Sequence, residues 1–148
     1  MLYTVKRHSQ NRLIKSNGRL KRIPTVRSLV YPGFPTDAGP ILISMLSIAK
    51  GTSVFVENIF ENRYKYIDEL KRFGAKIKCE GKVAVIEGVE KLYSAKVCCT
   101  DLRGGAALAL SGLAAEGETI LSEIGHIERG YDDIVGVLGR IGAQIEYI

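Results

Sequence analysis

The sequence predicts an α+β fold in one domain spanning all 148 residues. Two observations support this prediction. Stretches with strand-like alternation and stretches with helical spacing of apolar residues follow one another along the chain, and their order returns after about 66 residues, as in an internal duplication. Each copy is a strand–helix–strand–helix–strand unit, with boundaries at about residues 31–95 and 96–148. One such unit leaves helix faces uncovered, so the copies are expected to pack on one another.

The first 30 residues are expected to be extended chain. Leu2–Val5 alternates, Leu13-Ile14 starts a second strand, and Ser16-Asn17-Gly18-Arg19 is typical of a hairpin turn. Eight Lys and Arg residues and no acid lie here, within a net charge of +5. Such an arm can bind nucleic acid or an anionic surface. Nucleic-acid binding stays a disfavoured alternative, because Tyr3 is the arm's single aromatic and no RNA-module signature is present.

The first copy starts at a stiff corner, Tyr31-Pro32-Gly33-Phe34-Pro35-Thr36-Asp37. A helix is predicted from about Asp37 to Lys50, with Gly51 ending it in a left-handed conformation. The other predicted elements are a strand at 52–57, a loop at 58–63, a helix at 64–73 stopped by Gly74, and strands at 75–79 and 83–87 joined by a turn at 80–82.

The second copy repeats this order. Its predicted elements are a helix at about 102–115 stopped by Gly117, a strand at 118–123, a loop at 125–129, a helix at 131–141 stopped by Gly142, and a closing strand at 144–148. Alignment of the copies pairs Thr36-Asp37 with Thr100-Asp101, Glu57 with Glu123, and Arg63 with Arg129. Acids and arginines at matched places suggest one anion-binding site, or a pair of sites that has decayed.

Asp37 is the first candidate functional residue. The prolines restrict the chain before it, and Thr36 or Asp37 is expected to cap the following helix by accepting from a free N–H of its first turn. The carboxylate of Asp37 would then stand at a rigid corner beside a helix N-terminus, a well-held position for an acid that contacts a ligand. A plain N-cap without a ligand is the alternative.

Arginines supply the other candidates. Arg103 is expected in the first turn of a helix, where the dipole disfavours a cation unless an anion binds there. The alternative is a surface pair with Asp101. Gly104-Gly105 would let a ligand or another backbone come close, although no Walker-type Gly-Lys-Ser/Thr follows. Arg63 and Arg129 lie in the two matched loops, and arginine suits bidentate recognition of phosphate or carboxylate.

The remaining reactive residue types indicate no further chemistry. His126 could carry a proton or be structural. The three cysteines, Cys79, Cys98 and Cys99, show no metal-ligand spacing and are expected to be structural thiols in a reduced, cytoplasmic setting. No Ser/His/Asp set, metal site or cofactor motif is found. No apolar run approaches the roughly 18 residues of a membrane span.

Five motifs occur in an order that resembles one family of enzymes. They are YPGFPTD at 31–37, FENR at 60–63, TDLR at 100–103, LAAEGET at 113–119 and HIERGY at 126–131. They resemble the UDP-N-acetylglucosamine 1-carboxyvinyltransferase family of enolpyruvyl transferases. The resemblance implies an inside-out α/β prism, of which this chain would form about two of the three βαβαββ units of one domain, at the C-terminal end of the enzyme.

The resemblance also implies an activity. This family moves the enolpyruvyl group of phosphoenolpyruvate to the 3-hydroxyl of UDP-N-acetylglucosamine, the first committed step of peptidoglycan synthesis, and so serves cell-wall biogenesis, cell shape, cell division and the cell cycle. By motif, Asp37 would receive the hydroxyl proton, Arg103 and Arg129 would hold the phosphate and carboxylate of phosphoenolpyruvate, Ile59 would contact the nucleotide sugar, and Arg63 and Asp101 would orient the substrate. No cofactor or metal is implied.

Parts of the family pattern have no counterpart in this chain. The family's reactive cysteine lies on a loop of the other domain, and Cys79, Cys98 and Cys99 match no such position. The chain alone is therefore expected to be inactive and to need an N-terminal half, on the same or a separate polypeptide. The alternatives are a fragment of the shikimate-pathway enolpyruvyl transferase, and a non-catalytic or split-gene subunit that only binds anions.

Overall fold

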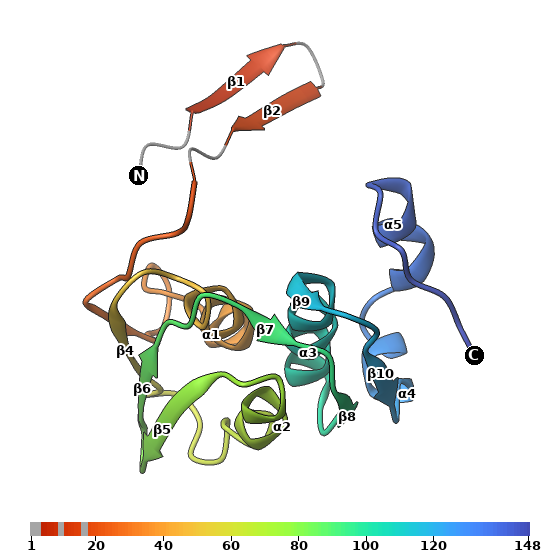
Figure 1. Ribbon diagram of the computed structural model, residues 1–148. Coiled ribbons are helices and arrows are strands. Elements are labelled where there is room, and N and C mark those ends of the chain that lie inside the picture. Colours follow the sequence, from red (N-terminus) through yellow and green to blue (C-terminus); the bar gives the residue numbers. More distant parts are fainter. Residues whose placement is uncertain (1–3, 9–10, 16–17) are drawn as a thin grey trace.

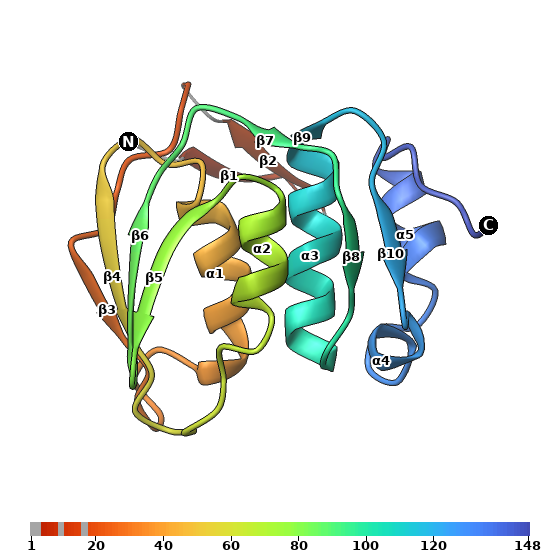
Figure 2. The same ribbon diagram turned by 60° about the horizontal axis from the view of Figure 1, so that its bottom comes forward.

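The computed structural model describes residues 4–8, 11–15 and 18–148. Two helices, α1 (Gly39–Leu46) and α3 (Leu102–Ala114), lie side by side in the middle of the molecule. A four-stranded sheet lies on one side of them and a pair of short strands on the other (Figure 2). The structure is therefore of the predicted mixed helix-and-sheet class.

The larger sheet has four strands, of which three lie within residues 31–95. Its strands are β3 (Thr25–Arg27), β4 (Thr52–Val56), β5 (Lys76–Glu80) and β6 (Val83–Glu87), in the order β3-β4-β6-β5. β3 runs parallel to β4, whereas β6 is antiparallel to both of its neighbours. The strands predicted at 52–57, 75–79 and 83–87 are confirmed. Gly81 has a positive φ of 54° in the turn between β5 and β6, as a tight hairpin requires.

The core lies between this sheet and the helices. Alternate residues of β4 and β6 are buried, and α2 (Ile67–Arg72) covers the same core. The largest buried apolar side chains are Ile43, Phe55, Tyr66, Ile67, Leu70, Phe73, Ile86, Leu92 and Leu108. The chain at Gly88 passes close to the backbone at Ala49. Only glycine fits there, because a Cβ at position 88 would lie 1.6 Å from the carbonyl oxygen of Ala49.

The strands of residues 96–148 are shorter. β8 (Lys96–Cys98) pairs in parallel with β10 (Ile120–Ser122), and β9 (Ala115–Glu116) pairs in parallel with β7 (Leu92–Tyr93), which lies just before them in the chain. Two short helices follow, α4 (Gly125–Glu128) and α5 (Ile134–Arg140). The predicted loop at 125–129 is therefore a helical turn, because the chain closes i→i+3 and i→i+4 bonds onto Ile124.

The predicted strand at 144–148 is wrong. In the first copy β5 hydrogen-bonds to β6 and to no other strand of its sheet. The segment at 144–148 has no strand beside it among the described residues, so it forms no ladder.

The predicted helices exist, but three of them are shorter than expected. The first splits into a 3₁₀ turn, η1 (Thr36–Ala38), and α1, which ends at Leu46 although Gly51 takes the expected positive φ of 102°. α2 and α5 each lose about a turn of their predicted length, and α3 fits within a residue.

The N-terminal segment forms an antiparallel pair, β1 (Thr4–His8) and β2 (Asn11–Lys15), which projects from the body of the molecule (Figure 1). The turn expected at 16–19 lies partly outside the described residues. Arg19 joins the segment to the body, because its guanidinium donates to the carbonyl oxygens of Ile48 (2.7 Å) and Val89 (2.5 Å). None of the helices described is long and apolar enough to cross a membrane.

Candidate functional site

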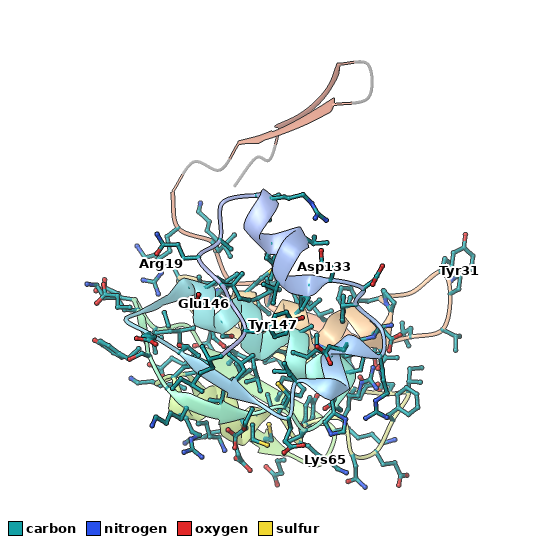
Figure 3. All side chains as sticks on the ribbon, turned by 90° about the vertical axis from the view of Figure 1, so that its right-hand side faces the viewer. Arg19, Tyr31, Lys65, Asp133, Glu146 and Tyr147 are labelled. Atoms are coloured by element: carbon teal, nitrogen blue, oxygen red, sulfur yellow. The ribbon has the colours of Figure 1, made fainter. Side chains whose placement is uncertain are left out.

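The corner before α1 does not use its acid as a cap. The residue preceding η1 is Pro35 and the one preceding α1 is Ala38, and neither helix has a side-chain cap. The expected capping role of Thr36 or Asp37 is therefore wrong. Both residues lie within the 3₁₀ turn, whereas a capping residue stands outside the helix with an extended backbone. The loop before them protrudes, and Tyr31 is 96% exposed (Figure 3).

Asp37 instead bridges two arginines that come from distant parts of the chain. Its Oδ1 accepts from Nη2 of Arg63, and its Oδ2 accepts from Nη2 of Arg103 at 3.1 Å. Arg63 belongs to the loop after β4 and Arg103 to the first turn of α3. The Asp37 side chain is 56% exposed, so this cluster is open to ligands from solution. These three candidate residues thus lie together at one place.

Arg103 has a second partner that the sequence analysis did not assign. Its Nη1 donates to the hydroxyl of Tyr131 at 3.1 Å, and its guanidinium lies 5.6 Å from the centre of the Tyr131 ring. The hydrogen bond to Tyr131 and the nearby Asp37 carboxylate raise the pKa of Arg103. Tyr131 is the last residue of the HIERGY motif, so the motif itself was the sequence signal that could have indicated this contact. Arg103 is thus held from two sides, between η1 and the segment after α4.

Asp101 has the capping role expected for Asp37. It stands before α3 with an extended backbone, and its Oδ1 accepts from the N–H groups of Arg103 (3.0 Å) and Gly104 (2.8 Å). The Asp101 carboxylate therefore orients the turn that carries Arg103, and the alternative surface pair between these two side chains is not formed.

Gly104 and Gly105 serve packing. A Cβ on Gly104 would come within 2.7 Å of the Tyr66 side chain, and one on Gly105 within 2.7 Å of Ile127. The expected close approach of a ligand or another backbone at these glycines is wrong, because neighbouring side chains already fill that space.

The loop after β4 combines charge with exposed apolar surface. Ile59 and Phe60 are both exposed, and the guanidinium of Arg63 lies 5.0 Å from the centre of the Phe60 ring. The Nε atom of Arg63 is buried and has no hydrogen-bond partner in the described structure. The exposed side chains of Ile59 and Phe60 let this loop offer a ligand an apolar contact close to the charge of Arg63.

Arg129 stands apart from the bridge. It caps α4, where its Nη2 lies 2.6 Å from Nδ1 of His126, and among the described residues it has no ion pair with Asp37. Its neighbour Gly130 packs against Leu102 at the start of α3, so a Cβ there would come within 2.7 Å of that side chain. Arg129 is exposed, and its guanidinium is available to an anion.

The thiols and potential metal ligands do not form a second site. Burial raises the pKa of Cys99 to about 11, so this thiol is neutral near pH 7. All three cysteines are free. In the part of the chain that the structure describes, no group of three or more His, Cys, Asp or Glu side chains could hold a metal ion.

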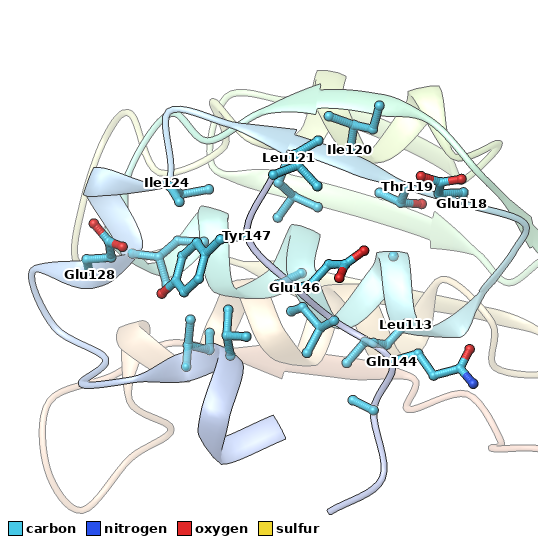
Figure 4. Close-up of a pocket in the computed structure, with 18 of the residues that line it drawn as sticks. Leu113, Glu118, Thr119, Ile120, Leu121, Ile124, Glu128, Gln144, Glu146 and Tyr147 are labelled. Carbon is cyan, nitrogen blue, oxygen red and sulfur yellow. The ribbon is translucent and has the colours of Figure 1, made fainter. Parts of the chain in front are cut away.

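A hollow of about 840 Å³ lies between α3, β10, α4, α5 and the C-terminal residues (Figure 4). Leu113, Leu121 and Ile124 give it an apolar lining, with Glu128 and Glu146 at its walls. None of Asp37, Arg63 or Arg103 lines it. The bridged carboxylate and the hollow are therefore separate features of the molecule.

The fold and the acid–arginine cluster define the class of protein. The model of the EPSP synthase (3-phosphoshikimate 1-carboxyvinyltransferase) family matches residues 2–138, and the chain belongs to this family. Among solved structures, the enolpyruvyl transferase NikO from Streptomyces tendae superimposes with a TM-score of 0.86 at 26% identity, over 97% of this chain and 33% of that one. EPSP synthase from Acinetobacter baumannii shares the fold, with a TM-score of 0.54 at 20% identity over 88% of this chain.

Similar sequences narrow the class further. The chain is 52% identical over 132 residues to UDP-N-acetylglucosamine 1-carboxyvinyltransferase 2 of Caldanaerobacter subterraneus subsp. tengcongensis, covering 89% of this chain and 32% of the relative. It is 48% identical over 136 residues to UDP-N-acetylglucosamine 1-carboxyvinyltransferase 1 of Clostridium perfringens, covering 92% and 32%. The chain spans about a third of the length of these relatives.

Proposed function

We propose that this chain supplies one side of the active site of an enolpyruvyl transferase. The enzyme would move the enolpyruvyl group of phosphoenolpyruvate to the 3-hydroxyl of UDP-N-acetylglucosamine and release phosphate. The names of the relatives near 50% identity support UDP-N-acetylglucosamine as the acceptor and a carboxyvinyl group as the group transferred. The observation that carries the proposal is the Asp37 carboxylate held between Arg63 and Arg103, since it combines a proton acceptor with cations that can bind an anionic substrate.

Each candidate residue has a place in this reaction. Asp37 accepts the proton of the 3-hydroxyl. Arg103 and Arg129 bind the phosphate and carboxylate of phosphoenolpyruvate, and an anion that occupies Arg103 competes with Asp37 for it and so frees one carboxylate oxygen. Ile59 contacts the nucleotide sugar, Arg63 orients Asp37, and Asp101 orients Arg103. Fixed guanidinium groups suit a reaction in which a multiply charged substrate must be held in register.

The remaining side of the site would come from the part of the family protein that this chain does not cover, on the same or a separate polypeptide. The chain alone would then be inactive. A cytoplasmic role in peptidoglycan synthesis, and through it in cell shape and division, follows from the same proposal.

A chimera tests the activity directly. Residues 1–148 replace the matching third of the Caldanaerobacter subterraneus relative, and release of phosphate is measured with phosphoenolpyruvate and UDP-N-acetylglucosamine. We expect turnover by the chimera, and none by the 148-residue chain alone. A folded chimera without turnover, beside an active parent enzyme, would contradict the proposal. Turnover with shikimate 3-phosphate in place of the nucleotide sugar would instead favour the reaction named for EPSP synthase, 3-phosphoshikimate 1-carboxyvinyltransferase.

Ligand binding by the chain is a second test. Calorimetric titration with UDP-N-acetylglucosamine, with and without phosphoenolpyruvate, measures whether residues 1–148 form a half-site. Binding that disappears in Asp37→Ala would support the role of the corner. Equal binding by both proteins would remove Asp37 from the site.

A further inference from the structure

Glu57 is a buried carboxylate that the proposed chemistry does not use. It lies directly after β4 and is 1% exposed. In the described structure it has no ion-pair partner within 4.0 Å, and it accepts hydrogen bonds instead. Oε1 accepts from the Ser28 hydroxyl (2.7 Å) and from the backbone N–H groups of Ile59 (2.8 Å) and Phe60 (3.2 Å), and Oε2 accepts from the Thr36 hydroxyl (2.7 Å).

These bonds join the two segments that carry the acid and one of its arginines. Thr36 directly precedes Asp37, and Ile59 and Phe60 begin the loop that ends in Arg63. Arg63 then returns to Asp37 through the ion pair. The contacts close a ring that runs from Asp37 through Thr36, Glu57 and the loop to Arg63. Glu57 is the one member of this ring that touches both segments from inside the fold.

We propose that Glu57 is the positioning residue that sets the distance between the Asp37 corner and the Ile59–Arg63 loop. This inference rests on the proposed function, because the geometry that it fixes is that of the acid and its orienting arginine. Glu57 does not touch the substrate in this proposal. It acts through Thr36 on one side and through the backbone of Ile59 and Phe60 on the other.

A carboxylate suits this place better than an amide of the same shape. Its oxygens only accept, and four donors converge on them. Glutamine keeps one acceptor oxygen and replaces the other with an NH₂ donor, to which the Thr36 hydroxyl could turn as an acceptor but the N–H groups of Ile59 and Phe60 could not. It also removes the negative charge, which weakens the hydrogen bonds that Ile59 and Phe60 still donate. Burial alone raises the pKa of Glu57, but the hydrogen bonds from Ser28, Thr36, Ile59 and Phe60 together lower it by more. The net pKa is below the usual value for Glu, so the group is ionised near pH 7.

The second copy supplies a matched control. Glu123 aligns with Glu57 and follows β10, but its side chain is exposed and its backbone has a positive φ of 56°. Glu123→Gln therefore makes the same chemical change at the corresponding place, without a converging set of buried donors.

Hydrogen exchange of the 148-residue chain tests the structural part. In Glu57→Gln we expect the amides of Ile59 or Phe60 to exchange roughly tenfold faster or more, while the amide of Ile86 in the core keeps its rate. Glu123→Gln should change none of these three rates. Unchanged exchange at both Ile59 and Phe60, or equal acceleration at Ile86, would overturn the proposal. Thr36→Val, which removes the donor to Oε2 alone, serves if Glu57→Gln does not fold.

Kinetics of the chimera test the functional part. We expect Glu57→Gln to lower kcat by roughly tenfold to a hundredfold, because small misplacements of reacting groups have effects of this size. The KM for phosphoenolpyruvate should change less than kcat, Thr36→Val should give a smaller loss, and Glu123→Gln none. An inactive parent chimera would count against the proposed function, and the exchange rates would still decide the role of Glu57. An active chimera whose kcat is unchanged by Glu57→Gln would overturn the inference alone.

Discussion

Asp37 and Asp101 stand at aligned places in the two copies and do different work. Asp101 has an extended backbone and caps α3, so its carboxylate bonds to backbone N–H groups. Asp37 lies within the 3₁₀ turn before α1 and binds two guanidinium groups instead. The 3₁₀ turn starts at Thr36, so Asp37 lies inside the turn and not before it, and its carboxylate does not accept from the N–H groups of the helix. Two acids in similar sequence contexts therefore have different partners: Asp101 bonds to the backbone, and Asp37 is exposed beside two arginines.

The second helices of the two copies differ in the same direction. Leu70 and Phe73 of the first copy are fully buried, whereas the aligned Leu138 is half-buried and Ile141 is 79% exposed. α2 packs against a four-stranded sheet, and α5 stands over the hollow beside two short strands. The same apolar pattern therefore contributes to a core in one copy and lies at the surface in the other.

The largest expected effect is the loss of activity on substitution of Asp37. Asp37→Asn in the chimera should lower kcat by roughly a hundredfold or more, the range typical of general acid–base residues. The free energy of unfolding should hardly change, because the Asp37 side chain is exposed. Steady-state phosphate release and urea denaturation measure the two quantities. Full activity in Asp37→Asn would contradict a catalytic role for Asp37.

Truncation of the aligned leucines tests the difference between the helices. Leu70→Ala should lower the free energy of unfolding by about 2–5 kcal/mol, because it empties a fully buried position. Leu138→Ala should cost less than about 1 kcal/mol, since its side chain is already partly in water. Urea denaturation of the 148-residue chain gives both values. Equal losses would mean that α5 packs as tightly as α2.

The cap at Asp101 should have a smaller effect on stability. Asp101→Ala removes the acceptor for two N–H groups and should lower the free energy of unfolding by about 1 kcal/mol. Asp101→Asn keeps an acceptor oxygen, and thermal denaturation should place its stability close to that of the unaltered chain. Asp37→Ala is the contrast, since no N–H group of α1 depends on that carboxylate.

The smallest effect is expected from pH. The folded-state pKa of Glu57 lies below 4.5, the value taken for the unfolded chain, so its contribution to stability is fully present above pH 4.5 and is lost as the pH falls through the folded-state value. The difference in unfolding free energy between the unaltered chain and Glu57→Gln should shrink accordingly as the pH falls below 4.5. Urea titrations at several pH values measure it, and a constant difference would contradict the assigned pKa direction. Glu123→Gln should show no such change.

The parts of the fold that could be predicted depend on local signals. The strands 52–56, 76–80 and 83–87 follow from alternation and from glycine turns, and α3 follows from its small apolar residues between Asp101 and Gly117. The segment 144–148 carries a similar local pattern but forms no strand, because a strand also needs a neighbour and local pattern does not supply one.

The candidate site shows the same limit. The motifs identified Asp37, Arg63 and Arg103 as candidates, but the capping role expected for Asp37 was wrong. The partners of Asp37 lie 26 and 66 residues away in the sequence, and local helix propensity carries no information about such distant contacts. Tyr131 and Glu57 were missed as contacts for the same reason. Their neighbours are brought together by the packing of α1 against α3 and by the end of β4, which are properties of the whole fold.

The bridge at Asp37 has a consequence for the speed of association. The bridge of Asp37, Arg63 and Arg103 carries a net charge of +1 at an exposed place, because the nearby carboxylates of Glu57 and Asp101 accept from hydroxyl and backbone N–H groups and not from these guanidinium groups. An approaching anion is attracted over about one Debye length, roughly 8 Å at physiological ionic strength. Added salt should therefore slow its arrival much more than its departure. The residue proposed to take the substrate's proton would in this way also moderate how fast the anionic substrate is drawn in.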